Sequence, residues 1–67
     1  MSVVADNLRH FADRAGLDSA ALAARTRIPA ADLARFLDGT AWPCPRTQAR
    51  LAAALGVTTA DLHAERE

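Results

Sequence analysis

Apolar residues recur every three or four positions near the start of the chain, which is the spacing of an amphipathic helix. This stripe consists of Val4, Leu8, Phe11, Ala12 and Ala15. Gly16 follows it, and a glycine just after such a stripe is typical of a helix C-terminus, where the backbone adopts a positive φ. The pattern therefore predicts a first helix over residues 4–15.

Two further helices follow at short intervals. Asp18 is a good N-cap for a short second helix over residues 20–25. Pro29 fits at the start of a third helix over residues 30–37, because the N–H that a proline lacks would be unpaired there. Gly39 ends this third helix. The residues expected to face the core are Leu22, Ala23, Leu33, Phe36 and Leu37.

The second half of the chain predicts a loop and two more helices. Residues 40–45 contain two prolines and the only tryptophan, Trp42, which we expect to pack beneath the loop. A fourth helix is predicted over residues 47–55, and Pro45 is an alternative first residue for it. Thr58 and Asp61 form a capping pair for a last helix over about residues 59–64. The inward residues of these two helices are Leu51, Ala52, Leu55 and Leu62.

This pattern predicts one all-α domain of five short helices over residues 1–67, without repeats or linkers. A chain of 67 residues buries a small core and is marginally stable. The only cysteine is Cys44, so neither an internal disulfide nor a cysteine-rich zinc site is expected.

No apolar run approaches the roughly 20 residues of a membrane-spanning helix, and no leader sequence is recognisable. We therefore expect a cytoplasmic protein, either bacterial or phage-encoded, with no membrane, cofactor, metal or small-molecule partner.

The chain carries no arrangement of residues that would support catalysis. No nucleophile has a partnered base, and no glycine-rich loop could cradle phosphates. His10 and His63 lie on different predicted helices, without the spacing of a metal site or a catalytic triad, and are expected at the surface. Cys44 stands where a helix cap is usual, and we interpret it as a cap or a half-buried thiol.

The net charge is zero, which does not favour a nucleic-acid binder, because arginines and lysines that neutralise phosphates supply most of the affinity for DNA. The distribution is more informative. Residues 19–50 contain five arginines and two aspartates, a net charge of +3, whereas both flanks are acidic. The middle of the chain is thus the part suited to an anion.

Residues 17–39, Leu17-Asp18-Ser19-Ala20-Ala21-Leu22-Ala23-Ala24-Arg25-Thr26-Arg27-Ile28-Pro29-Ala30-Ala31-Asp32-Leu33-Ala34-Arg35-Phe36-Leu37-Asp38-Gly39, resemble the helix-turn-helix of the Cro and lysogenic-repressor (XRE) family. Trp42-Pro43, Thr47, the run from Leu51 to Val57, and Asp61-Leu62 resemble that family's later helices. The resemblance covers about residues 8–63 and implies a lambda-repressor-like fold, with the helix-turn-helix at about residues 19–38. The family pattern requires a small residue, here Ala23, where the two helices cross. It also requires apolar residues, here Ile28 and Leu33, to fill the gap between the helices.

The resemblance also implies a DNA-binding role. In such a fold the second helix of the pair lies in the major groove, and neighbouring helix N-termini face phosphates. Carried over position by position, the base-reading residues are Ala30, Ala31 and Arg35. The phosphate-contacting residues are Ser19, Arg27, Thr40, Arg46 and Thr47.

Several positions depart from the family pattern. Ser19 replaces a frequent glutamine, and Arg27 replaces a turn glycine, so that the turn is either strained or built without a positive φ. Ala30 and Ala31 offer little direct readout, which leaves Arg35 as the one candidate for a bidentate contact to guanine. The alternative for Arg35 is a surface pair with Asp32 or Asp38, and for Asp32 an interaction with the helix dipole.

The leading hypothesis is therefore a small transcriptional regulator that binds double-stranded DNA, as a homodimer through residues 59–67 or as a monomer. The alternative is a protein-binding module, such as an antitoxin, an anti-repressor or a phage inhibitor of a host factor. The position of the charges distinguishes them. A DNA partner would be favoured if the N-terminus of the third helix gathered Arg25, Arg27, Arg35 and Arg46. A protein partner would be favoured if Asp32 and Asp38 dominated that surface.

Overall fold

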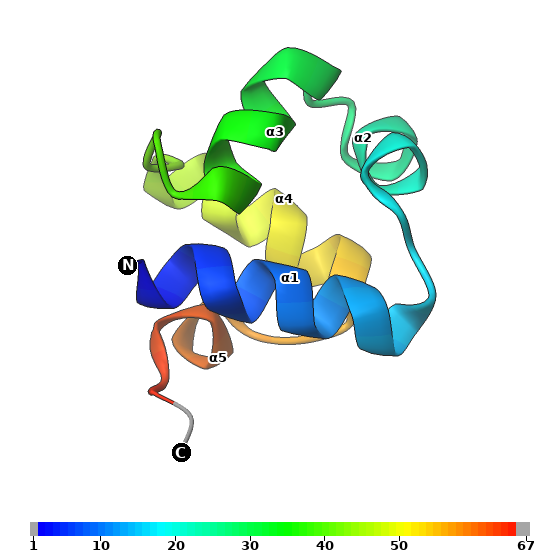
Figure 1. Cartoon of the computed structure of the whole chain (residues 1–67). Helices are drawn as coiled ribbons and strands as arrows, with labels where there is room; N and C mark the ends of the chain where they lie inside the picture. Colours follow the sequence, from blue (N-terminus) through cyan, green and yellow to red (C-terminus); the bar gives the residue numbers. More distant parts are fainter. Residues whose placement is uncertain (1, 66–67) are drawn as a thin grey trace.

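The computed structural model describes residues 2–65, and within that range the chain forms five helices and no strand. The helices are α1 (Val3–Ala15), α2 (Ser19–Thr26), α3 (Ala30–Asp38), α4 (Pro45–Leu55) and α5 (Thr59–His63). Figure 1 shows α1 crossing the domain with α3 on one side, α5 on the other and α4 behind it. α2 packs on both α3 and α4. The predicted all-α fold of five short helices is confirmed.

The helix ends follow local capping signals. The carboxylate of Asp18 accepts the N–H of Ala21 at 2.8 Å, as its predicted N-cap role requires. Thr58 and Asp61 form the predicted capping box at the start of α5. Pro45, and not Thr47, is the first residue of α4. α5 ends at His63, one residue before the predicted end, because Ala64 has an extended backbone.

Each helix contributes one fully buried leucine to a single core. These leucines are Leu8, Leu22, Leu33, Leu51 and Leu62. The other buried apolar residues among the helices and turns are Val4, Ala5, Ala12, Ile28 and Ala52. Phe36, Leu37 and Leu55 were predicted to face inward and are half-buried at the margin of the core, whereas Ala15, placed in the first apolar stripe, is exposed. The apolar periodicity thus identified the core, and overestimated its width at the end of α1.

One buried amide joins the two ends of the domain. Asn7 lies among the apolar residues of α1, and its Nδ2 donates to the carbonyl oxygens of Leu62 and Ala64 at 2.8 and 2.7 Å. These carbonyls belong to the last turn of α5 and its C-cap, which a five-residue helix leaves without intrahelical partners. Asn7 therefore holds α5 against α1, a role that the sequence analysis did not anticipate.

The prediction that Trp42 packs beneath the loop after α3 is wrong. Trp42 is 60% exposed, and its ring lies 6.1 Å from that of His63. The buried residue of the loop is Pro43, whose carbonyl accepts the side-chain amide of Gln48 at 2.9 Å. Gln48 also pairs with His63 at 2.6 Å. Because Pro43 already fills the space below the loop, the indole points outward.

None of the helices in residues 2–65 combines the length and the apolar character that crossing a membrane would require.

Candidate nucleic-acid interface

The α2–turn–α3 unit is built as the sequence pattern requires. Ile28 and Leu33 are buried in the core, and Ala23 is partly buried against it. The hydroxyl of Thr26, which is buried, donates to the carbonyl of Leu22 at 2.8 Å and accepts the N–H of Ile28 at 3.3 Å. These contacts fix the turn at the end of α2 and thereby set the direction in which α3 leaves it.

The turn has a left-handed residue at Arg27, which is the C-cap of α2 with a φ of 60°. Among residues 2–65, this is the only residue other than glycine with a positive φ. The alternative geometry, a turn without a positive φ, is therefore not adopted. A side chain in this region costs about 1–2 kcal/mol because Cβ approaches the following carbonyl oxygen. The left-handed backbone of this exposed arginine therefore lowers the free energy of unfolding of the domain.

We expect Arg27→Gly to raise the free energy of unfolding by about 0.5–1 kcal/mol, because glycine adopts a positive φ without steric strain. Urea denaturation followed by circular dichroism would measure the change. Arg25→Gly is the matched control: it removes the same side chain two residues earlier, inside α2, and is expected to lower stability by about 0.5–1 kcal/mol. Equal destabilisation by both substitutions would contradict the strain at Arg27.

The outer face of α3 is mostly alanine. Ala30, Ala31 and Arg35 are exposed, as their predicted base-reading role requires. The Arg35 guanidinium, however, lies 2.7 Å from the Asp32 carboxylate, so the surface pair considered for this residue is present. Pro29, the N-cap of α3, provides no side-chain cap, and the first N–H groups of the helix therefore meet no capping side chain.

The predicted phosphate-contacting residues lie at four places: the start of α2, the turn that contains Arg27, the loop after α3 and the start of α4. Ser19 opens α2, and both Ser19 and Arg46, which stands in the first turn of α4, are exposed. Thr40 directs its hydroxyl to the carbonyl of Arg35 at 3.4 Å and so helps to end α3. Thr47 is half-buried, and its hydroxyl meets the Cys44 thiol at 3.2 Å.

Cys44 is the N-cap of α4 and is exposed at the surface. Its pKa is lowered, first by the hydrogen bond from the Thr47 hydroxyl and then by the backbone N–H of the same residue. The thiol thus stands close to the donors that a serine or aspartate cap would satisfy.

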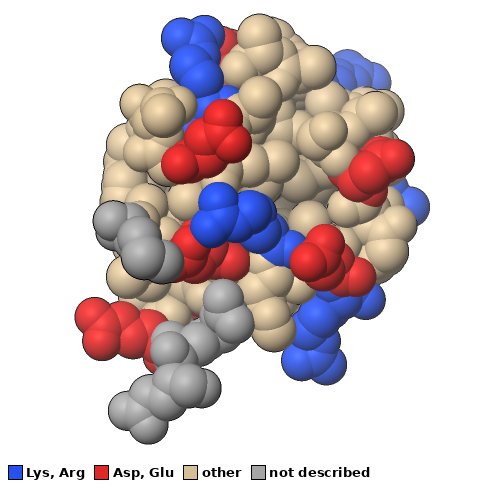
Figure 2. Space-filling view, in the orientation of Figure 1, with Lys and Arg blue, Asp and Glu red and all other residues tan. Residues whose placement is uncertain are grey.

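Charges are unevenly distributed over the surface. In the orientation of Figure 1, acidic side chains are scattered across the face formed by α1 and its neighbours, and most basic side chains in view lie at the rim. Figure 2 therefore shows a face that is poorly suited to a phosphate backbone. A polyanion is expected to bind elsewhere on the domain.

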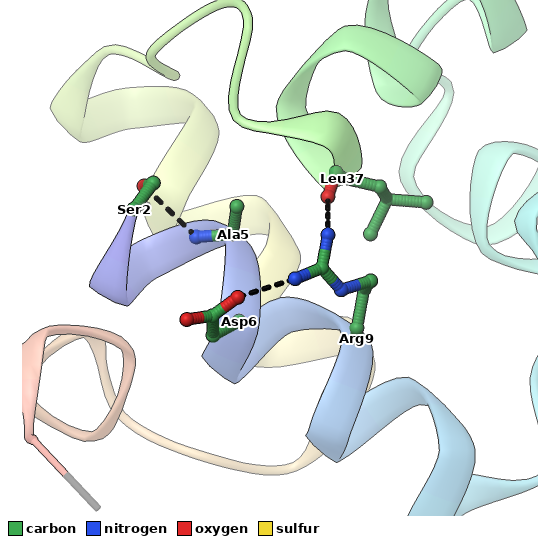
Figure 3. A network of polar contacts seen from close by, with 5 residues as sticks. All are labelled: Ser2, Ala5, Asp6, Arg9 and Leu37. Carbon is green, nitrogen blue, oxygen red and sulfur yellow. Dashed lines mark hydrogen bonds and ion pairs between the residues drawn. The ribbon is translucent and has the colours of Figure 1, made fainter.

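Arg9, on α1, forms an ion pair and a hydrogen bond with other residues of the domain. Figure 3 shows its guanidinium between the Asp6 carboxylate and the carbonyl oxygen of Leu37, near the C-terminus of α3. A cation suits the last carbonyls of a helix, which carry a partial negative charge. Arg9 therefore helps to position the C-terminal end of α3, the end that carries Arg35, a role that the sequence analysis missed.

Three further arginines gather near the C-terminus of α2. Arg25, Arg27 and Arg50 line one surface groove together with Thr26, Ala53 and Ala54. No residue of α3 lines this groove. Two of the four arginines named by the charge criterion, Arg25 and Arg27, thus line a groove with residues of α4, and a third, Arg35, pairs with Asp32.

The comparison with protein families matched residues 4–65 to the helix-turn-helix domain. The match spans nearly the whole chain and includes the α2–α3 unit described above. The chain therefore belongs to the helix-turn-helix domain family, a class of DNA-binding domains. Searches of curated proteins and of solved structures found no match.

Proposed function

We propose that the chain is a small, sequence-specific transcriptional regulator of the Cro and lysogenic-repressor type, which inserts α3 into the major groove of DNA. The observation that carries this proposal is the α2–α3 unit, whose packed turn leaves the uncapped first turn of α3 exposed. A helix presented in this way fits the major groove, and its N-terminal residues are the ones that reach base edges.

The proposed contacts divide into two kinds. Base readout is assigned to Ala30, Ala31 and Arg35, where the alanines offer methyl contacts and the guanidinium offers a bidentate hydrogen bond. Phosphate contacts are assigned to Ser19, Arg27, Thr40, Arg46 and Thr47, which flank α3 at the starts of α2 and α4 and in the adjoining turn and loop. Because one arginine carries most of the readout, we expect modest sequence preference.

The test is fluorescence-anisotropy titration of labelled duplexes, one of random sequence and one from upstream of the gene, across a salt series. Arg46→Ala is expected to weaken binding to both duplexes and to reduce the salt slope by about 1, because one phosphate contact is lost. Arg35→Ala is expected to erode mainly the preference between duplexes, by about 1–3 kcal/mol. Absence of binding at low salt would refute the proposal.

A second substitution in α3 tests whether the ion pair restrains Arg35. Asp32→Asn removes a negative charge beside the reading face and releases the guanidinium, so we expect DNA affinity to rise about two- to fivefold, within the worth of an exposed ion pair. Asp13→Asn, at an exposed position of α1, removes the same charge away from α3 and should change affinity little.

The Asp32–Arg35 pair also supports a second candidate function, a protein-binding module on a helix-turn-helix fold. In that function the alanines of α3 would form an apolar contact face, and the paired charges would lie at its border. This function would be favoured if the Asp32→Asn variant bound DNA no more tightly than the wild-type chain, or not at all, and if a protein partner captured the chain.

We further propose that two copies pair through the face that carries Trp42, so that both α3 helices reach one DNA duplex. The exposed indole borders a groove lined by Pro45, Ala49, Thr59 and Ala60, so one face holds both a projecting ring and a recess. A two-fold axis pairs a surface with itself, and half-sites one DNA turn apart, about 34–36 Å, would then be expected. This face includes part of the predicted dimer segment, of which residues 66 and 67 lie outside the described range.

Trp42→Ser is expected to weaken self-association at least about tenfold, because a central tryptophan commonly contributes 2 kcal/mol or more to an interface. Sedimentation equilibrium would measure the dissociation constant. Val3→Ser is the control, because Val3 is the other large exposed apolar residue of the described chain and lies outside the groove. A monomeric wild-type chain at high concentration would exclude the dimer and leave monomeric binding.

A further inference from the structure

The three arginines around the α2–α4 groove have no role in the proposed DNA interface, apart from Arg27 at its border. Arg25 belongs to the last turn of α2, Arg27 caps that helix, and Arg50 comes from the middle of α4. All three are exposed, and none forms an ion pair with another residue of the range 2–65. No acidic residue lines the groove.

A structural role does not account for this grouping. A cation near a helix C-terminus interacts favourably with the helix dipole, which explains Arg25. Arg50, however, lies five residues before the end of α4, too far for this interaction. Arg27 has a strained, left-handed backbone, which lowers stability. Like charges held close together repel one another unless an anion lies between them. The grouping is therefore expected to cost stability when the groove is empty.

Two alanines also line the groove. Ala53 and Ala54 stand one turn after Arg50 on α4, and together with the arginines they form a recess that combines small apolar residues with a cationic border. A DNA backbone would satisfy the guanidinium groups but would leave the alanines without a contact. An acidic polypeptide offers both, since carboxylates can pair with the arginines while an apolar side chain covers the alanines.

We propose that this groove is a docking site for an acidic segment of a partner protein, in which carboxylates flank an apolar side chain. No residue of α3 lines the site, and Arg25 and Arg50 are not among the residues proposed to contact DNA. This proposal does not depend on DNA binding and can fail or succeed independently of it.

The test uses the full chain and a short fluorescein-labelled peptide in which aspartates alternate with leucines, followed by anisotropy. Arg25→Gln and Arg50→Gln are each expected to weaken peptide binding about two- to fivefold, and together roughly tenfold. Arg14→Gln removes the same charge from an exposed position of α1 and is expected to have little effect. Circular dichroism verifies folding, which these exposed substitutions should preserve.

Two further measurements identify the occupant. The same peptide with asparagines in place of aspartates should not bind, because it lacks the carboxylates. The double variant should bind a DNA duplex about as tightly as Arg14→Gln does. The proposal would be overturned by failure of the wild-type chain to bind the acidic peptide, by equal losses in all three single variants, or by a selective loss of duplex binding in the double variant, which would assign the groove to nucleic acid.

Discussion

Leu33→Ala is expected to leave most of the chain unfolded at room temperature. Leu33 is fully buried and belongs to the core shared by all five helices. Replacing such a leucine by alanine costs about 2.7–5 kcal/mol, because the transfer free energy of the side chain is lost and a cavity remains. A domain of this size has a total stability of only a few kcal/mol. Circular dichroism during urea denaturation would show the loss of the cooperative transition.

The neighbouring residue provides the control for this prediction. Ala34 is exposed on the outer side of α3, and Ala34→Ser is expected to change stability by no more than about 0.5 kcal/mol. Survival of a normal transition in Leu33→Ala would mean that α3 is not anchored to the core through this side chain. DNA binding should disappear together with the fold, because α3 has no other fully buried residue.

Asn7→Asp is expected to destabilise the domain by about 2–3 kcal/mol, although the two side chains have nearly the same shape. The Nδ2 group of Asn7 donates to carbonyls at the end of α5, and a carboxylate in the same place would meet those oxygens as another acceptor. A buried polar group without its partner costs about 1–3 kcal/mol, and more when it is charged. Amide hydrogen exchange would reveal faster opening of α5 than in the wild-type chain.

The pH dependence of this variant is a second measurement of the same effect. An aspartate buried against carbonyl oxygens favours its protonated form, so part of the lost stability should return as the pH falls below the range in which that carboxyl ionises. The wild-type chain, whose Asn7 side chain does not ionise, is the control. Wild-type stability of Asn7→Asp at neutral pH would contradict the role assigned to Asn7.

The helices were predictable because their signals are local. The Asp18 cap and the Thr58–Asp61 pair act within four residues, and the buried leucines follow a simple period. The outward position of Trp42 was not predictable from the sequence. It depends on the burial of Pro43 below the loop and on the hydrogen bond between Gln48 and the carbonyl of Pro43. Asn7 carried a usable signal: it stands three residues after Val4, on the apolar stripe itself, where a polar residue needs a partner.

The candidate site was predictable only in part for a similar reason. Exposure of Ala30, Ala31 and Arg35 follows from the apolar period of α3, which places them opposite the core. Whether Arg35 extends outward or turns back to Asp32 depends on a side-chain conformation that the sequence leaves open. The groove of Arg25 and Arg50 joins residues that are far apart along the chain, and it appears only when α2 packs on α4.

The contact between Asn7 and the end of α5 also has a consequence for the order of folding. It joins residues 57 positions apart, so nearly the whole described chain must be closed into one loop before it can form. Contacts between α2 and α3 require only short loops and can form early. We therefore expect α5 to dock late and to open first, while the contacts between α2 and α3 are still in place.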